Sequence, residues 1–554
     1  MTELPLRAPY DPLPVRRRRE RVRTVASTGV AIVGVVSLLA AVSPPFRHRL
    51  HVVLEVLPSV VPPTAATTLV LVSVGLLLMA RGLRHGQRLA WWGTLVLLVA
   101  SVLLHLARGL GVEAAVITTS GATWLATQRT SFGVLPSRAT VRRALVLGTI
   151  GGVFAVVLAV TLTEAVEPPR FHRFDRMVLP LAIVAGAALV AAAAWILLSP
   201  KDPRRLTAEQ HREERERARA VVKRYGAGTL DWFALRDDKD WFFTGRSVVA
   251  HAVHGGVCLV SPDPIGPDDE QVAVWSEFLA YVEQHGWSVA VLGARPERLP
   301  LYEASGLRPV YLGDEAIVDC REFALAGAKN KSLRQAVGRV RREGYTTTFH
   351  DPASLDPALR AQLEDLRGQS RRGGRERGFS MTLSRLFDPQ DIDFLLAVTR
   401  NRAGRVDAFA QWVPAPGIDG WSLDVMRRRI SGDVPNGVIE ACIVATIEEV
   451  AARGDLALSL NFAPMRSVLE STEVGGPLVV LTRPLLAQMS ERTQMASLAM
   501  FNRKFHPRWE PRYVVLDSVE WVASQSLVMA DVEGVTELPV IGRFLGRSSA
   551  PGGR

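Results

Sequence analysis

Residues 405–413 read RVDAFAQWV, residues 437–454 read GVIEACIVATIEEVAARG, and residues 456–462 read LALSLNF. The outer two runs are short and apolar, whereas the middle run has the length and spacing of a helix. The same alternation occurs upstream, where SVVAHAVHGGVCLV and WSVAVLGA flank the helical pattern DEQVAVWSEFLAYVEQHG. Repeated strand–helix alternation indicates an α/β or α+β domain with a mixed central sheet.

The first 200 residues have a different composition, in which apolar blocks are joined by basic connections. Each block approaches the roughly 20 residues that a helix needs to cross a bilayer. If all six cross, the basic groups fall on one side, which the positive-inside rule makes cytoplasmic. In the fourth block Glu113 leaves a re-entrant segment as the alternative. The sequence therefore predicts an α-helical membrane domain of six spans, at residues 25–43, 64–80, 89–106, 111–127, 144–163 and 177–198.

These changes of composition set the expected domain boundaries. About 340 residues follow the apolar half, enough for two packed subdomains. The expected parts are a basic cytoplasmic tail at 1–24, the transmembrane domain at 25–200, a charged linker helix at 201–224, a first subdomain at 225–345, a second at 346–545 and a disordered tail at 546–554.

A net charge of +11 indicates an anionic partner, either lipid head groups or nucleic acid. Basic residues are dense in segment 329–342, which is either a landing site for such a partner or a solvated helix face. Cys258, Cys320 and Cys442 are too scattered for a disulfide framework or a metal site. Phosphate-loop, nucleophile-elbow and HExxH motifs are absent, so we expect no metal and no cofactor.

Eight segments carry a family resemblance in order along the second half. They are VSPDPIG, the long run YLGDEAIVDCREFALAGAKNKSLRQAVGRVRREGY, RERGFSM, AFAQWVP, WSLDVMRR, DVPNGVIEACIV, LSLNFAPM and FNRKFHPRWEPRYVV. Together they resemble the phosphatidylglycerol lysyltransferases, or multiple peptide resistance factors, over about residues 225–520. Any one segment is weak evidence, whereas eight in register are strong.

The resemblance implies two GNAT-like acyltransferase folds side by side and a cytoplasmic catalytic domain on a multi-pass cell-membrane protein. It implies transfer of an aminoacyl group, lysyl first among the candidates, from charged tRNA to a glycerol hydroxyl of phosphatidylglycerol. In this family the aminoacylated lipid lowers the negative surface charge of the membrane, which makes the cell resistant to cationic antimicrobial peptides. The family's flippase module is missing here, so we expect a separate protein to translocate the product.

Four residues match the family's catalytic segments. Asp424 and Arg427 either share a helix face or converge at a strand end, where Asp424 accepts a proton and Arg427 binds a phosphate or the oxyanion. Glu440 lies at the apolar start of a helix and suits the role of general base, and Lys504 suits the binding of an anionic group. The alternatives are a surface ion pair for Asp424 and Arg427, a carboxylate at a helix start for Glu440, and a solvated strand edge for Lys504.

The resemblance also implies a set of substrate-binding residues. Asn461 belongs to the amino-acid pocket, where the following Phe462 departs from the family's glycine. The remaining members are Arg503, Arg512, Ser380 and Asp263, and the alternative for Asp263 is a turn and subdomain packing. Two other functions stay open: the same chemistry on another acceptor such as diacylglycerol, and a non-catalytic lipid-binding protein.

Overall fold

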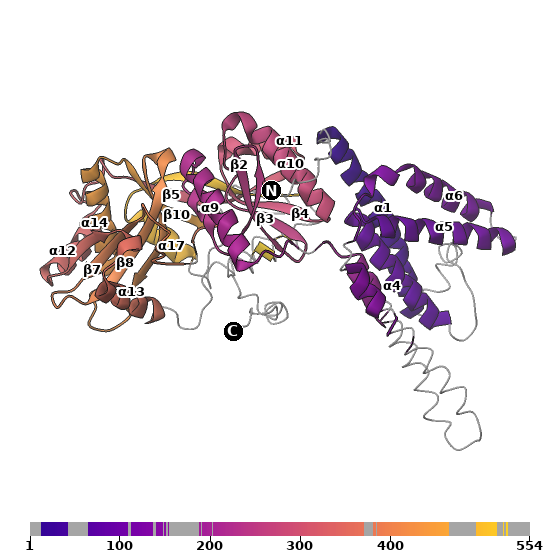
Figure 1. Cartoon of the computed structure of the whole chain (residues 1–554), viewed down its shortest axis with the longest axis horizontal. Coiled ribbons are helices and arrows are strands. Elements are labelled where there is room, and N and C mark those ends of the chain that lie inside the picture. Colours follow the sequence, from indigo (N-terminus) through magenta and orange to yellow (C-terminus); the bar gives the residue numbers. More distant parts are fainter. Residues whose placement is uncertain are drawn as a thin grey trace, which may run out of the picture. The chain divides into compact units, whose positions relative to one another are not determined.

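The computed structural model divides into two compact units, which we describe separately (Figure 1). Unit 1 comprises Met1–Arg204 with Leu279–Ser288, and unit 2 comprises Arg205–Phe278 with Val289–Arg554. The structure describes residues 13–42, 65–108, 112–136, 140–147, 149–150, 153, 188–189, 191–201, 203–369, 380–383, 385–464, 495–517, 525 and 528–529. The predicted tail at 546–554 and most of the family segment RERGFSM lie outside these residues.

Unit 1 is helical. Its named helices are α1 (Leu13–Val42), α4 (Ala65–Arg84), α5 (Arg88–Arg108) and α6 (Val112–Thr127), followed by the short helix η1 (Arg129–Ser131). α1 packs along α4, and α5 packs against α6. Trp91 of α5 is buried in their core and donates its indole N–H to the carbonyl of Leu125, 2.8 Å away. Burial of small and aromatic side chains therefore joins these helices.

The prediction of six membrane spans is wrong. Among the described residues, no helix is both long and apolar enough to cross a membrane. α1 begins with an arginine-rich run, and α6 has only 16 residues. Sixteen helical residues extend about 24 Å, less than the roughly 30 Å of a hydrocarbon core. Much of the fifth and sixth predicted spans lies outside the described residues.

Unit 2 is built on one 11-stranded sheet, with strand order β1-β2-β3-β4-β11-β5-β10-β9-β8-β7-β6. Its first half supplies α9 (Ala208–Tyr225), the short helix η2 (Asp231–Leu235), β1 (Asp240–Thr244), β2 (Ser247–His254), β3 (Val257–Val260), α10 (Gln271–His285), β4 (Ser288–Ala294), α11 (Leu299–Ala304) and β5 (Arg308–Asp319). Of these elements, the end of α10 from Leu279 and the first residue of β4, Ser288, fall within unit 1. Its second half supplies α12 (Lys331–Arg342), β6 (Thr346–His350), α13 (Pro357–Gln369), β7 (Leu395–Arg400), β8 (Val406–Ala415), β9 (Gly420–Arg428), α14 (Val438–Arg453), β10 (Ala457–Pro464), α17 (Met495–Arg503) and β11 (Arg508–Leu516).

The two halves repeat one succession and exchange their last strands. β3–α10–β4–α11–β5 has the same order of elements as β9–α14–β10–α17–β11. β11 pairs with β4 and β5, whereas β5 pairs with β10 of the second half. The two halves therefore form a single continuous sheet, because each half completes its sheet with a strand of the other.

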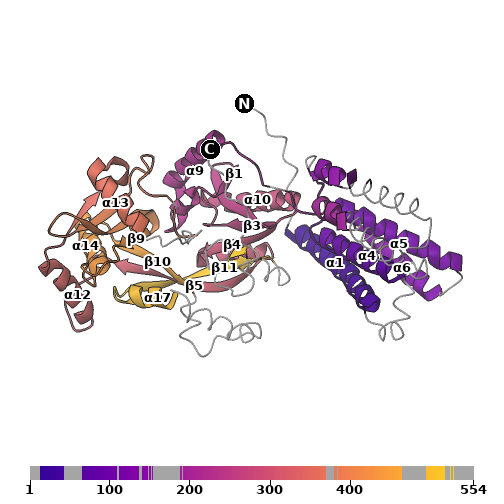
Figure 2. The ribbon, with the colours of Figure 1, turned by 90° about the horizontal axis from the view of Figure 1, so that it is seen from below.

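Helices cover both faces of the second half of the sheet (Figure 2). Ala408, Ala410 and Trp412 of β8 belong to the core that α12 and α14 cover, and we call this side the α14 face. Phe409 of β8 and Val425 of β9 pack with α13 on the opposite side, which we call the α13 face. Successive residues of a strand point to opposite faces, so the two faces can be assigned residue by residue.

Candidate functional site

The segment around Asp424 is a strand that contains a β-bulge. β9 pairs with β8, and the register shifts between Gln411 and Trp412, which leaves Asp424 as the extra residue. Asp424 contacts the Gln411 side chain, and Arg427 lies opposite Phe409, two residues along from Gln411. Asp424 and Arg427 therefore share the α13 face, although residues three apart in a regular strand point to opposite faces.

Asp424 is buried, and both oxygens of its carboxylate accept hydrogen bonds. Its Oδ1 accepts from the Leu383 backbone N–H and its Oδ2 from Gln411 Nε2, each at 2.8 Å. The Oε1 of Gln411 and the Oγ of Ser422 are buried without a hydrogen-bond partner among the described residues. Because a carboxylate oxygen accepts more than one hydrogen bond, this cluster can receive a donor such as an ammonium or hydroxyl group.

Asn461 joins β10 to the same cluster. Its backbone has φ of 66°, a left-handed conformation that asparagine tolerates better than most residues. Its side-chain amide donates to the carbonyls of Leu423, at 2.9 Å, and Met381, at 3.1 Å. Asn461 and Asp424 thus hold the segment that follows the buried Ser380. Asn461 donates to the Met381 carbonyl, and Asp424 accepts from the Leu383 N–H.

Arg512 and Glu315 form a buried ion pair between β11 and β5. Arg512 Nε donates to Glu315 Oε2 at 2.9 Å, and its Nη2 also contacts that carboxylate. Arg512 further donates to Thr229 Oγ1 at 2.7 Å, and the Ser459 hydroxyl contacts Glu315 Oε1. The backbone N–H of Asn461 donates to Ser459 Oγ at 3.1 Å, so a hydrogen-bonded chain links the ion pair to Asn461.

Burial alone would raise the pKa of Glu315, but the Arg512 charge and the hydroxyl hydrogen bonds hold that pKa below its usual value. Glu315 is therefore ionised at neutral pH and balances the buried guanidinium. Arg512 therefore belongs to an internal charge pair, and it is 3% exposed.

Glu440 and Lys504 form a second cluster, on the elements of the α14 face. Glu440 lies in the first turn of α14, and Lys504 follows α17. Their Oε1 and Nζ atoms are 2.8 Å apart, and the side chains are 14% and 44% exposed. The structure therefore separates the four expected catalytic residues into two pairs, one on each face of the sheet.

Two expected substrate-binding residues lie elsewhere. Arg503 is an exposed residue at the end of α17. Asp263 is buried, where it accepts from Tyr302 Oη at 2.6 Å and from the backbone N–H of Arg295 at 3.1 Å. These bonds fasten the end of β4 and α11 to the loop after β3, in agreement with the structural alternative for Asp263.

Sequence reasoning missed Glu315, Ser459 and Gln411. Glu315 could have been noticed, because it directly precedes the apolar strand residues AIV, and a carboxylate buried with them needs a partner. Ser459 and Gln411 gave no comparable signal, since polar residues in strands are usually solvated. Their roles depend on strand pairing that the sequence does not reveal.

The cysteines do not form a reactive site. Burial raises the pKa of Cys442 to about 12 and that of Cys320 to about 12, which keeps both thiols protonated at neutral pH. Among the described residues, no group of three or more His, Cys, Asp or Glu side chains is placed to hold a metal ion.

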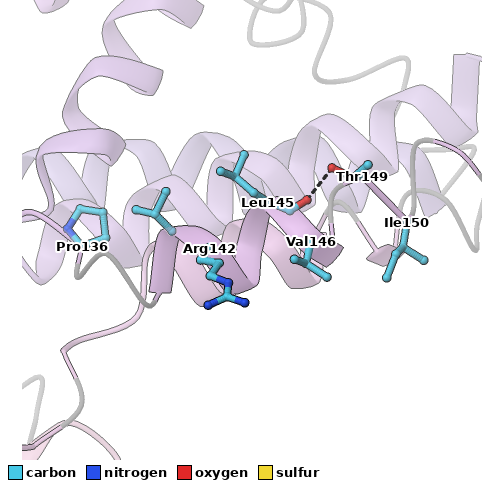
Figure 3. A pocket seen from close by; sticks show the side chains of 7 residues that line it. Pro136, Arg142, Leu145, Val146, Thr149 and Ile150 are labelled. Carbon is cyan, nitrogen blue, oxygen red and sulfur yellow. Dashed lines mark hydrogen bonds between the residues drawn. The ribbon is translucent and has the colours of Figure 1, made fainter.

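A surface hollow of about 570 Å³ lies in unit 1 (Figure 3). Thr149 donates its hydroxyl to the carbonyl of Leu145 there, at 2.8 Å. The lining is apolar apart from this threonine and one arginine, and consists of Pro136, Val141, Arg142, Leu145, Val146, Thr149 and Ile150. None of these lining residues is a carboxylate, a histidine or a lysine that could act as an acid or a base. We therefore assign the candidate chemistry to unit 2.

Known protein families match the part of the chain that forms this sheet. The family profile described as "Phosphatidylglycerol lysyltransferase, C-terminal" matches residues 219–516, more than half of the chain. The chain belongs to this family. The sequence-based prediction of a phosphatidylglycerol lysyltransferase relative, and hence of a transferase family, is confirmed.

Two curated relatives are similar over most of the chain. The lysylphosphatidylglycerol biosynthesis bifunctional protein LysX of Rhodococcus opacus is 30% identical over 567 aligned residues, which cover 95% of this chain and 50% of the relative. The LysX protein of Mycobacterium avium is 31% identical over 561, covering 94% and 47%. The chain thus spans about half the length of these relatives.

Among solved structures, L-PGS from Bacillus licheniformis superimposes with a TM-score of 0.51 at 25% sequence identity. The match covers 57% of this chain and 96% of that one. The fold of the family's C-terminal region is therefore present here nearly whole.

Proposed function

We propose that this family member transfers an aminoacyl group, lysyl in the first instance, from charged tRNA to a glycerol hydroxyl of phosphatidylglycerol. Family membership supports the lipid substrate and the transferase chemistry. The observation that carries the proposal for this chain is the buried Asp424 carboxylate, which is hydrogen-bonded to Gln411, whose Oε1 is buried without a partner among the described residues. Such a cluster suits an aminoacyl group, because its ammonium is rich in donors.

The reaction needs no external energy source, because the tRNA ester is already activated. A lipid hydroxyl attacks the ester carbonyl, and the new C–O bond forms as the carbonyl becomes a tetrahedral oxyanion. Collapse of this intermediate breaks the bond to the tRNA ribose oxygen, which takes up a proton. The hydroxyl must lose its proton and the oxyanion needs nearby positive charge, so a base and a cation are required.

We assign these roles to the two pairs described above. Asp424 accepts the proton that the attacking hydroxyl loses, as well as hydrogen bonds from the substrate's ammonium, and Arg427 on the same face supplies a guanidinium for the oxyanion or a phosphate. On the opposite face of the sheet, Lys504 offers a cation for an anionic group of a substrate, and Glu440 holds Lys504 in place through their 2.8 Å contact. Asn461 maintains the Asp424 segment through its bonds to Leu423 and Met381.

We further propose that the reaction takes place at the inner leaflet of the cell membrane. Charged tRNA is made in the cytoplasm and phosphatidylglycerol resides in the bilayer, so the two substrates meet at that surface. The excess of basic residues, with a net charge of +11, favours contact with this anionic leaflet.

The test is to express the chain in a bacterial host that lacks aminoacylated lipids and to analyse the lipids by mass spectrometry. Wild-type protein should produce an amino-acid–bearing phosphatidylglycerol, whose mass also identifies the amino acid. Asp424→Asn should abolish this product, whereas Asp393→Asn, an exposed carboxylate paired with Lys223, should leave it unchanged. If wild-type protein at normal abundance yields no aminoacylated lipid, the proposal is wrong; if the acceptor proves to be diacylglycerol, only the choice of lipid changes.

A further inference from the structure

α12 presents a strongly basic surface on one side and an apolar one on the other. Leu333, Val337 and Val340 are buried in the core of the α14 face. On the opposite side the exposed residues include five cations, which we call the α12 cations: Lys331, Arg334, Arg339, Arg341 and Arg342. At 100° per residue these cations fall within about 160° of the helix circumference.

Three of these cations have charges available for a partner. Arg334 donates to the carbonyls of Leu325 and Gly327, and Arg341 pairs with Glu448. In the part of the chain that the structure describes, the side chains of Lys331, Arg339 and Arg342 have no hydrogen-bond or ion-pair partner. They lie on one side of a helix about 16 Å apart from end to end, a distance that spans several phosphates of a nucleic-acid strand.

α12 packs against α14, the helix whose first turn carries Glu440 (Figures 1 and 2). Gly437, which precedes α14, lies so close to α12 that a Cβ there would be 2.9 Å from Ala336. Asn330, which precedes α12, shares a 2.6 Å hydrogen bond with His506, two residues after Lys504. The α12 cations are therefore held by direct contacts to the two segments that carry Glu440 and Lys504.

We propose that the α12 cations form the docking surface for the RNA substrate, through its phosphate backbone. This inference rests on the proposed function, which supplies tRNA as the donor. Arginine predominates, and its planar fork binds phosphate oxygens in pairs. The exposed residues of α12 are otherwise polar, whereas a helix that inserts into a membrane surface needs exposed apolar side chains. An RNA backbone fits this surface better than a lipid bilayer.

The test compares the triple variant Lys331→Gln, Arg339→Gln and Arg342→Gln with a matched control. The control is Arg212→Gln, Arg308→Gln and Arg360→Gln, three exposed cations on α9, β5 and α13 with no side-chain partner among the described residues. Binding of the full chain to fluorescently labelled, uncharged tRNA is measured by anisotropy from 50 to 300 mM salt. Sedimentation with phosphatidylglycerol vesicles is measured in parallel.

We expect the α12 variant to bind tRNA at least tenfold more weakly than the control. The slope of log Kd against log salt concentration should fall by two to three, about one for each phosphate that the variant no longer neutralises. Its vesicle binding should match that of the control. Equal tRNA binding by the two variants, or a defect confined to vesicles, would overturn the proposal.

The two proposals can fail separately. If wild-type cells contain aminoacylated lipid but the α12 variant behaves as its control, the docking surface is wrong and the function stands. If the α12 variant alone fails to bind tRNA but no aminoacylated lipid forms, the docking surface stands and the transferase function is wrong.

Discussion

Glu315 of β5 and Arg512 of β11 form a buried ion pair between the two strands that the halves of the sheet exchange. β11 comes from the second half of the chain and pairs with β4 of the first, and β5 comes from the first half and pairs with β10 of the second. The ion pair therefore joins the two halves where they meet within the sheet. Through Ser459 the same pair reaches the backbone of Asn461, next to the candidate site. Stability and function should therefore depend on it together.

Breaking this pair should destabilise unit 2 strongly. Arg512→Leu leaves the Glu315 carboxylate buried and unpaired, which should cost about 3–5 kcal/mol of unfolding free energy. Arg508→Leu, which removes an exposed ion pair with Glu510 on the same strand, should cost less than about 1 kcal/mol. Urea denaturation followed by tryptophan fluorescence distinguishes the two, and equal midpoints would show that the internal pair contributes nothing.

The same pair should make stability depend on pH. The folded-state pKa of Glu315 is lowered, so its stabilisation is complete above the unfolded-state pKa of about 4.3 and is lost as the pH falls through the folded value. Glu315→Gln should thus be less stable than wild type at pH 7, with a difference that narrows below about pH 4. Thermal unfolding midpoints from pH 7 to 3 measure this, and a constant difference would contradict it.

Asn461 should have separable backbone and side-chain roles. Asn461→Ala removes the amide bonds and also strains the left-handed backbone, which costs about 1 kcal/mol or more. Asn461→Gly removes the same bonds but relieves the strain, so it should be the more stable of the two. Both should abolish lipid aminoacylation if the amide positions the Asp424 segment. Retained transfer in Asn461→Gly would show that only the backbone conformation matters.

Substitution of Lys504, the partner of Glu440, should affect activity far more than stability. Because Lys504 is 44% exposed, Lys504→Met should change the unfolding free energy by less than about 1 kcal/mol. It should nevertheless lower lipid aminoacylation by about 100-fold, the usual effect of removing one charge-stabilising donor. Arg453→Met, which removes the exposed pair with Glu449 on α14, is the control with full activity expected. A Lys504→Met enzyme as active as this control would remove Lys504 from the site.

Some assignments need only the linear sequence. Eight segments in order identified the family, because the order and spacing of short motifs can be read from the sequence without knowledge of the fold. The alternation of RVDAFAQWV, the helix at 437–454 and LALSLNF indicated the sheet, and these runs are β8, α14 and β10. The expected spans failed because, among the described residues, no helix is both long and apolar enough to cross a membrane.

Tertiary structure decided how the expected residues are grouped. The sequence by itself determined the family and the presence of Asp424, Arg427, Glu440 and Lys504 in its motifs. Strand exchange brought Glu315 to Arg512 across 197 residues, and a bulge turned Asp424 to the face of Arg427. Both depend on hydrogen-bond register between strands distant in sequence, and a shift of one residue reverses the face of every side chain. Local propensity carries no information on that register, so only the folded sheet could show which of these residues share a face.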